Sequence, residues 1–235
     1  MQAENNFLDI KKEIYVSISN NKYFQKANRF TKRILQVILT EVLSSYNLSP
    51  YLYRLFSSEE LWNHSVNVMM LTILLAREVK SDNLKLDDLI IGSLFHDLGK
   101  IYIPAEILNK SNKLSSDDKK ILRLHPIYSY ECLKDSGLSK LTLDIVKYHH
   151  LNKGYPEGSP EFGSLKYINI VALADAFDAM ISPRPYQKAK NIDKAIEEIQ
   201  NNLGSQFDIT YGEIFIELIS AIITEYSKEK NIAYM

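Results

Sequence analysis

The stretch LFHDLGK, residues 94–100, places two ionisable residues side by side within an apolar pattern. The preceding run LDDLIIGSLF predicts a helix with acidic residues in its first turn, which we expect to end at Gly99. His96 and Asp97 would then point inward. Burying an imidazole or a carboxylate without a partner costs on the order of a few kcal/mol. The pair therefore needs partners from elsewhere in the chain.

The other four histidines are the first candidates for these partners. His64 follows Glu60 by four residues, so both side chains share one face of a predicted helix. His125 precedes a proline, and His149 and His150 are adjacent at a predicted helix end, where they differ by about 100° around the helix. Taken alone, each histidine fits a hydrogen-bonded core residue or a helix cap better than a ligand. Together they indicate a metal site, because neutral imidazole and carboxylate are natural ligands of first-row divalent metals.

Two aspartates lie inside the long apolar stretch YINIVALADAFDAM, residues 167–180. Asp175 and Asp178 are three residues apart, so both need partners if this helix is buried. We expect Asp175 to be a metal ligand and Asp178 to support it. A cap or an ion pair between Asp178 and Arg184 is the alternative.

The patterns in the rest of the chain also indicate helices, and alternating strand patterns are scarce, so we predict an all-α fold. SSEE suggests a capping box in which Ser57 pairs with Glu60, and SSDD from Ser115 repeats the pattern. Asn191 resembles an N-cap for a helix closed by Gly204. The predicted helices cover about residues 57–79, 86–99, 115–124, 136–150, 167–180, 192–203 and 209–228.

Composition limits the classes of function. The chain has 28 basic and 29 acidic residues, so it has no broad positive field for duplex nucleic acid. Cys132 is its only cysteine, which excludes an internal disulfide. The longest apolar run, residues 66–76, is too short to span a bilayer, and residues 1–12 lack the apolar core of a secretory signal. We therefore expect no membrane segment, and a cytoplasmic protein or a soluble part of something larger.

A length of 235 residues suits one domain with a short extension. We expect a main domain over residues 51–235. Residues 1–50 would form a helical N-terminal segment, either regulatory or part of the main bundle.

Several motifs in fixed order resemble those of HD-GYP proteins, a branch of the HD-domain superfamily. They extend from about residue 57 to 225, and they are HDLGKIYIPAEILNKSNKLSSDD (96–118), HP (125–126), HH (149–150), GYP (154–156) and ADAFDAMISPRPYQKA (174–189). The resemblance implies an HD-domain helical bundle. It also implies metal-dependent hydrolysis of the bacterial second messenger cyclic di-GMP, to pGpG, GMP or both, by a metal-bridged hydroxide.

The same resemblance assigns roles to residues of this chain. It implies two or three divalent ions, typically iron or manganese, with Asp97 as the bridge because a carboxylate has two oxygens. Lys100 is implied as a phosphate-binding catalytic residue, Arg184 as a second phosphate ligand and Tyr155 as a substrate contact. The implied metal ligands are His64, His96, Asp97, His125, His149, His150 and Asp175, with Glu60 as a further ligand for a third ion.

The chain departs from the family pattern after its paired histidines. Leu151 replaces a glutamate, the loop before GYP is three residues shorter, and Gln187 replaces a basic residue. These departures favour a second hypothesis, an inactive module that binds cyclic di-GMP or a signalling partner. A third is an HD phosphohydrolase acting on another nucleotide. The partners that we expect are cyclic di-GMP, a GGDEF-type or other signalling protein at the GYP loop, and a second copy of the chain in a homodimer.

Overall fold

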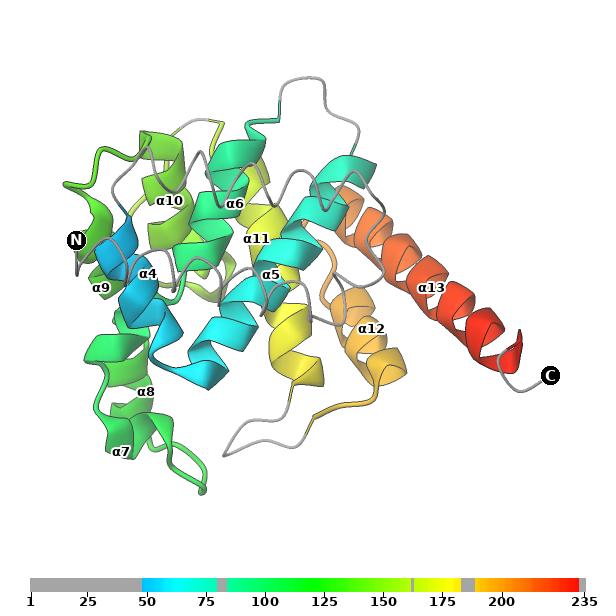
Figure 1. Cartoon of the computed structure of the whole chain (residues 1–235), viewed down its shortest axis with the longest axis horizontal. Coiled ribbons are helices and arrows are strands. Elements are labelled where there is room, and N and C mark those ends of the chain that lie inside the picture. The colour runs from blue at the N-terminus through cyan, green and yellow to red at the C-terminus, as the bar shows by residue number, and fades with distance from the viewer. Residues whose placement is uncertain (1–47, 80–83, 162, 183–188, 233–235) are drawn as a thin grey trace, which may run out of the picture.

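The protein is a bundle of helices arranged around one central helix, α5 (Figure 1). The computed structural model describes residues 48–79, 84–161, 163–182 and 189–232. No β-strand occurs in this part of the chain, which confirms the predicted all-α fold. The α-helices are α4 (Ser49–Phe56), α5 (Glu59–Glu78), α6 (Leu86–Phe95), α7 (Ala105–Leu108), α8 (Ser116–Leu122), α9 (His125–Leu133), α10 (Lys140–Tyr148), α11 (Leu165–Ile181), α12 (Ile192–Asn201) and α13 (Ile209–Ile232), with the short 3-10 helices η2 (Leu98–Tyr102) and η3 (Leu151–Lys153).

Helix α5 is central because it is apolar around most of its circumference, which is typical of a buried helix. One face, which includes Met69, packs against Phe95 and other residues of a core shared with α4 and α6. Another face, which includes Leu71, joins a second core formed with α11, α12 and α13. In that core the rings of Phe177 and Phe215 meet edge to face with their centres 5.3 Å apart. The two cores therefore fix the positions of α5 and α11, and with them the polar residues that these helices carry.

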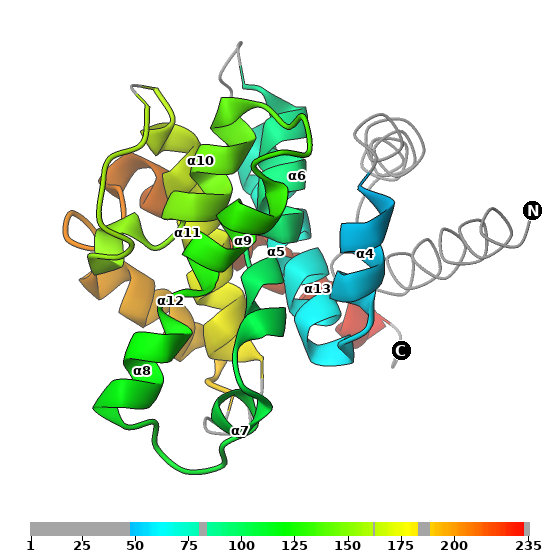
Figure 2. The ribbon, with the colours of Figure 1, turned by 90° about the vertical axis from the view of Figure 1, so that its left-hand side faces the viewer.

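Helices α7 and α8 form an arm that extends from one end of the bundle, as both ribbon views show (Figure 2). Helix α8 has no buried residue, and Ile107 is the buried residue of α7. The start of α8 is stabilised locally instead. Ser115 accepts a hydrogen bond from the amide of Asp118, whose carboxylate in turn accepts from the amide of Ser115, as the predicted capping box requires.

Two predicted helix ends are wrong. The N-cap of α5 is Ser58, whose side chain accepts from the amide of Leu61, whereas the hydroxyl of Ser57 donates to the carbonyl of Arg54. Glu60 is therefore not the partner of a Ser57 capping box. Helix α6 ends at Phe95 rather than Gly99, because the chain turns there into η2.

Helices α10 and α13 also differ from the predicted ranges. Helix α10 begins after its N-cap Ser139 and ends at Tyr148, and α13 continues to Ile232. The N-cap role of Asn191 is confirmed, because its side chain accepts from the amide of Asp193. Residues 1–47 lie outside the described residues, so the predicted N-terminal segment stays a prediction. Among the described helices, none has the length and apolar character that crossing a membrane requires.

Candidate metal centre

Five elements bring the predicted ligands to one buried point. His64 comes from α5, His96 and Asp97 from the junction of α6 and η2, and His125 from the start of α9. The junction of α10 and η3 supplies the two adjacent histidines, and α11 supplies Asp175. All seven side chains are buried: His64, His96, Asp97, His125, His149, His150 and Asp175. Residues separated by more than a hundred positions in the chain thus meet, as the sequence predicted.

The carboxylate of Asp97 lies between two groups of histidines. The first group is His64 and His96, and the second is His125, His149 and His150. Its Oδ2 is 3.2 Å from Nε2 of His64 and 3.4 Å from Nε2 of His96. Its Oδ1 is 3.0 Å from Nε2 of His125, on the other side. Asp175 repeats the pattern, with Oδ1 3.2 Å from His64 Nε2 and Oδ2 3.7 Å from Nδ1 of His150. Each aspartate therefore offers one oxygen to each group.

Three histidines are oriented by backbone carbonyls at helix ends. The Nδ1 of His96 donates to the carbonyl of Ser93 at 2.7 Å, and that of His125 donates to the carbonyl of Leu122 at the same distance. The Nδ1 of His149 donates to Val146, 2.9 Å away. Each acceptor lies three residues earlier, where the last turn of a helix leaves carbonyls free. This arrangement keeps the proton on Nδ1 and leaves Nε2 with a lone pair for a metal.

His64 is oriented by a carboxylate instead. Its Nδ1 donates to Oδ2 of Asp178 over 2.8 Å, while Oδ1 of Asp178 accepts from Asn67 at 2.8 Å and from Ser182 at 3.2 Å. Asp175 therefore faces the centre, and Asp178 lies behind the ring of His64, while their roles as ligand and support stay predictions. The alternative partner Arg184 lies outside the described residues.

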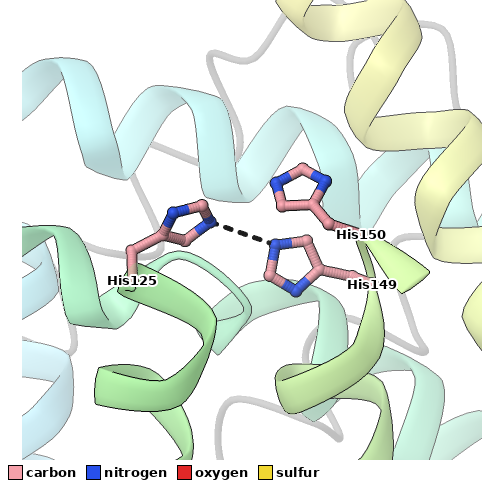
Figure 3. A group of neighbouring side chains, drawn as sticks. All are labelled: His125, His149 and His150. Carbon is pink, nitrogen blue, oxygen red and sulfur yellow. Dashed lines mark hydrogen bonds between the residues drawn. The ribbon is translucent and has the colours of Figure 1, made fainter. Parts of the chain in front are cut away.

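The second group of histidines shows why a cation fits here (Figure 3). The Nε2 atoms of His125 and His149 face each other at 3.3 Å, and His150 lies beside them with its ring centre 4.1 Å from that of His149. Both Nδ1 atoms already donate to carbonyls, so two neutral rings would present the lone pairs of their Nε2 atoms to each other. A cation bound by both nitrogens would remove that repulsion.

The buried polar atoms without a hydrogen bond are concentrated at the same centre. Within the described residues they include Nε2 of His64 and of His96, Oδ1 of Asp97 and Nδ1 of His150. Leaving such atoms unpaired costs on the order of 1–3 kcal/mol each. Metal coordination would satisfy all four, so the residues present fit a metal centre with more than one ion.

Electrostatics keep the two aspartates and the paired histidines His149 and His150 in the forms that metals bind. Burial would raise the pKa of Asp97, but Lys100, His96 and His125 hold that pKa well below its usual range. The same balance of burial against neighbouring histidines lowers the pKa of Asp175. Burial lowers the pKa of His149 and that of His150, so both stay neutral.

His64 shows how strongly this centre attracts positive charge. Burial opposes its protonation, yet the carboxylates of Asp175, Asp178 and Asp97 raise its pKa to about 10. A proton on His64 therefore supplies part of the positive charge that a metal cation would bring. Metal binding would displace this proton, because a metal binds the neutral imidazole.

The remaining predicted site residues lie around this centre or outside the described chain. The Nζ of Lys100 donates to Oδ2 of Asp97. Tyr155 is half-buried, and its ring centre is 4.9 Å from that of His150. Glu60 is exposed and lines a cavity of about 340 Å³ that also contains His64 and Lys100. Arg184 and Gln187 lie outside the described residues.

Some residues of the centre had no signal in the sequence analysis. Asn67 and Ser182, which bind Asp178, are ordinary helix and turn residues in the sequence. The orienting carbonyls have no side-chain signature at all. Only His125 directly followed a predicted helix end, whereas His96 and His149 lay inside the predicted ranges 86–99 and 136–150 and follow helix ends only in the structure.

An all-α bundle that gathers histidines and aspartates at one buried centre has the architecture of an HD-type, metal-binding domain. The HD domain model matches residues 61–180, and the chain belongs to the HD-domain family. The family predicted from the sequence motifs is thereby confirmed.

Curated relatives support this membership. The chain is 31% identical over 171 residues to the cyclic di-GMP phosphodiesterase PdeB of Borreliella burgdorferi, covering 72% of this chain and 45% of the relative. It is 28% identical to a cyclic di-GMP phosphodiesterase of Thermotoga maritima, covering 94% and 59%. A 3'3'-cGAMP-specific phosphodiesterase of Vibrio cholerae is 30% identical, covering 70% and 36%. The chain therefore spans about half the length of these relatives or less.

The fold has solved counterparts. A HDG"Y"P protein from Bdellovibrio bacteriovorus, Bd1817, matches with a TM-score of 0.57, covering 88% of this chain and 70% of that one. At 19% sequence identity this match supports the fold alone.

Proposed function

We propose that this chain is a metal-dependent phosphodiesterase that hydrolyses cyclic di-GMP. The observation that carries the proposal is the position of Asp97, whose two oxygens face two separate groups of histidines. A pair of metal ions held across such a carboxylate would stabilise the attacking and the leaving oxygen of a phosphodiester and activate water near neutral pH. The relatives named as cyclic di-GMP phosphodiesterases supply the substrate class.

The proposed metals are iron or manganese, because imidazole and carboxylate ligands suit both. The six ligands other than Asp97 divide into two groups around it. His64 and His96 would hold one ion, and His125, His149 and His150 the other, with Asp175 reaching both. Glu60, one helical turn before His64, is the proposed ligand of a third ion.

Lys100 is proposed to bind the phosphate that is cleaved. Its Nζ contacts Oδ2 of Asp97, and the residue also lines the 340 Å³ cavity beside His64. An ammonium on a flexible stem can move from the carboxylate to a phosphate oxygen once the carboxylate holds cations. Tyr155 and Arg184 complete the proposed substrate contacts, as the family resemblance implies.

The cavity gives the proposal a place for the rest of the substrate. Its walls come from the start of α5, from the arm and from the end of α11, and they include Glu60, Ile107, Leu122 and Ser182. A volume of this size lies at the small end of the range for ligand pockets, and its mixed polar and apolar lining suits a nucleoside.

The competing proposal is a module that binds cyclic di-GMP, or a signalling partner, without turnover. Leu151 stands where the family has a glutamate, and it packs against the second core. A GGDEF-type protein at residues 154–156, a homodimer and a cytoplasmic location belong to the proposal in either form.

Hydrolysis assays on protein loaded anaerobically with iron or manganese test the proposal. Cyclic di-GMP, 3'3'-cGAMP and cyclic di-AMP are supplied separately, and chromatography distinguishes pGpG from GMP. We expect cyclic di-GMP to be the preferred substrate. Binding of cyclic di-GMP without any product would favour the module, and preference for another nucleotide would overturn the substrate assignment.

A further inference from the structure

Arg123 lies at the edge of the metal centre, next to the second group of histidines. Its Cζ is 5.1 Å from the centre of the Tyr155 ring, within the range of a cation–π contact. The Tyr155 ring is in turn 4.9 Å from the ring of His150. Tyr155 therefore lies near both this guanidinium and a proposed metal ligand.

The backbone around Arg123 is tied to the centre. The amide of Arg123 donates to the carbonyl of Lys119 at 3.0 Å, which makes Arg123 the C-cap of α8. The carbonyl of the preceding residue, Leu122, accepts from Nδ1 of His125. The position of the arginine is thus set by the same helix end that orients a metal ligand.

The side chain of Arg123 has no evident structural task. It is exposed, and it makes no ion pair with an acidic residue in the described part of the chain. Other cations nearby do pair, such as the half-buried Lys110 with Asp118 and the exposed Lys120 with Asp117. An arginine held over a tyrosine and left without a carboxylate keeps its planar set of donors free for a ligand.

Two acceptors match a guanidinium fork, namely a phosphate and the O6/N7 edge of guanine. The cation beside the bridging carboxylate is Lys100, which the proposed function assigns to the cleaved phosphate. Arg123 instead stands beside an aromatic ring, and nucleic-acid bases that leave their stack are bound by aromatic faces together with hydrogen bonds to their edges.

We propose that Arg123 binds the O6/N7 edge of one guanine of the substrate, with Tyr155 packing against that base, and so favours guanine over adenine. This inference rests on the proposed function, because it takes a cyclic dinucleotide as the ligand of the centre. Adenine presents N7 as an acceptor but a donor amino group in place of O6, so the fork would lose one of its two bonds.

The test compares kcat/KM for cyclic di-GMP and for cyclic di-AMP in wild type, Arg123→Ala and Arg123→Lys, all with bound metal. We expect Arg123→Ala to reduce the preference for cyclic di-GMP on the order of 5- to 150-fold, the discrimination that a bidentate arginine–guanine pair provides. Arg123→Lys should lose the preference as well, because lysine keeps the charge but not the fork.

Two controls separate this role from others. Bis(p-nitrophenyl) phosphate has no guanine. Arg123→Ala should therefore reduce its hydrolysis less than that of cyclic di-GMP, and the two reductions should differ on the order of 5- to 150-fold. Arg77→Ala removes an exposed arginine at the far end of α5, about 20 Å along the helix from His64, and should leave the preference intact.

Several results would overturn the inference. One is an equal loss of kcat/KM for both dinucleotides in Arg123→Ala, and another is no loss of kcat/KM at all in that variant. A third is a wild-type preference in Arg123→Lys, which would indicate a phosphate contact. Wild type that does not hydrolyse cyclic di-GMP would overturn the proposed function alone. Calorimetric binding of cyclic di-GMP and cyclic di-AMP to the same variants would then decide the role of Arg123, and wild type that binds neither would overturn both.

Discussion

Asp178 and His64 form a buried hydrogen bond, with Oδ2 of Asp178 2.8 Å from Nδ1 of His64. Asp178 is completely buried, and Asn67 and Ser182 hold its other oxygen. The bond fixes the tautomer of His64, so that Nε2 faces the two aspartates of the centre. Asp178 is thus placed to act on the centre through His64, a proposed metal ligand, without facing the centre itself.

We expect Asp178→Asn to lower metal affinity about 10- to 100-fold, as the loss of partners behind metal ligands does. Asparagine would also place an amide donor against Asn67 or His64, so one of these contacts would be lost. Titration with a competing chelator measures the affinity.

Asp144→Asn is the matched control for this change. Asp144 is a buried aspartate that accepts from the amide of Glu161 and the hydroxyl of Ser164, both at 2.8 Å, away from the ligand cluster. It should lose stability without losing metal affinity. An equal loss of affinity in both variants would mean that Asp178 acts only through the fold.

The proposed bridging role of Asp97 predicts the metal content. Wild-type protein reconstituted without oxygen should hold at least two transition-metal ions per chain, because seven histidine and aspartate ligands exceed the needs of one ion. Asp97→Ala should lower that number and abolish hydrolysis, since one carboxylate serves both groups. Elemental analysis that finds no more than one ion in wild type would contradict a multinuclear centre.

Lys100 should behave differently from Asp97. Lys100→Ala removes a cation from the cavity but no ligand atom, so we expect the metals to remain and substrate binding or turnover to fall. Measuring metal content and the kinetic constants on the same sample separates the two effects. Loss of the metals from this variant would show that Lys100 supports the centre through Asp97 rather than through a phosphate.

The sequence predicted which side chains gather at the candidate centre but not how they are oriented. His96, Asp97 and Asp175 stand out because ionisable residues in apolar helices need partners. The acceptors of Nδ1 in His96, His125 and His149 are backbone carbonyls, which leave no mark in the sequence. Their placement depends on where each helix ends, and helix ends are the part of the fold that sequence patterns predict least well.

Gly99 illustrates this limit. Its place after Asp97 suggested the glycine that closes a helix, yet it lies in η2, packed against the start of α9. A Cβ at this position would overlap the carbonyl oxygen of His125 and the amide nitrogen of Ser129, while the amide of Gly99 donates to the Ser129 hydroxyl at 2.7 Å. The glycine is required by a close approach of two backbones, which only the folded chain reveals.

Gly99→Ala should therefore destabilise the protein by about 1–3 kcal/mol or more, since neither overlapping atom can move without shifting α9. Gly212→Ala is the matched control, because its Cβ would meet the flexible end of the Leu203 side chain. Urea unfolding compares the two. A similar small loss in both variants would mean that η2 and α9 separate easily.

The last prediction concerns Glu60, the proposed ligand of a third ion. Because Ser58 caps α5, Glu60 has no capping-box partner and lies exposed in the first turn, on the wall of the cavity and one turn before His64. Glu60→Gln should lower the metal content by about one ion and leave the ions around Asp97 in place, because an amide is a poorer ligand than a carboxylate.

Glu59→Gln is the control for this last change. Glu59 shares the first turn of α5, so both variants lose the same favourable charge at a helix N-terminus, worth about 0.3–1 kcal/mol. Both should therefore show the same small loss in thermal unfolding, and Glu60→Gln alone should lose an ion. If the metal content is equal in the two variants, or if anomalous scattering from fully loaded crystals shows two peaks, Glu60 serves the helix end and the cavity wall rather than a third metal.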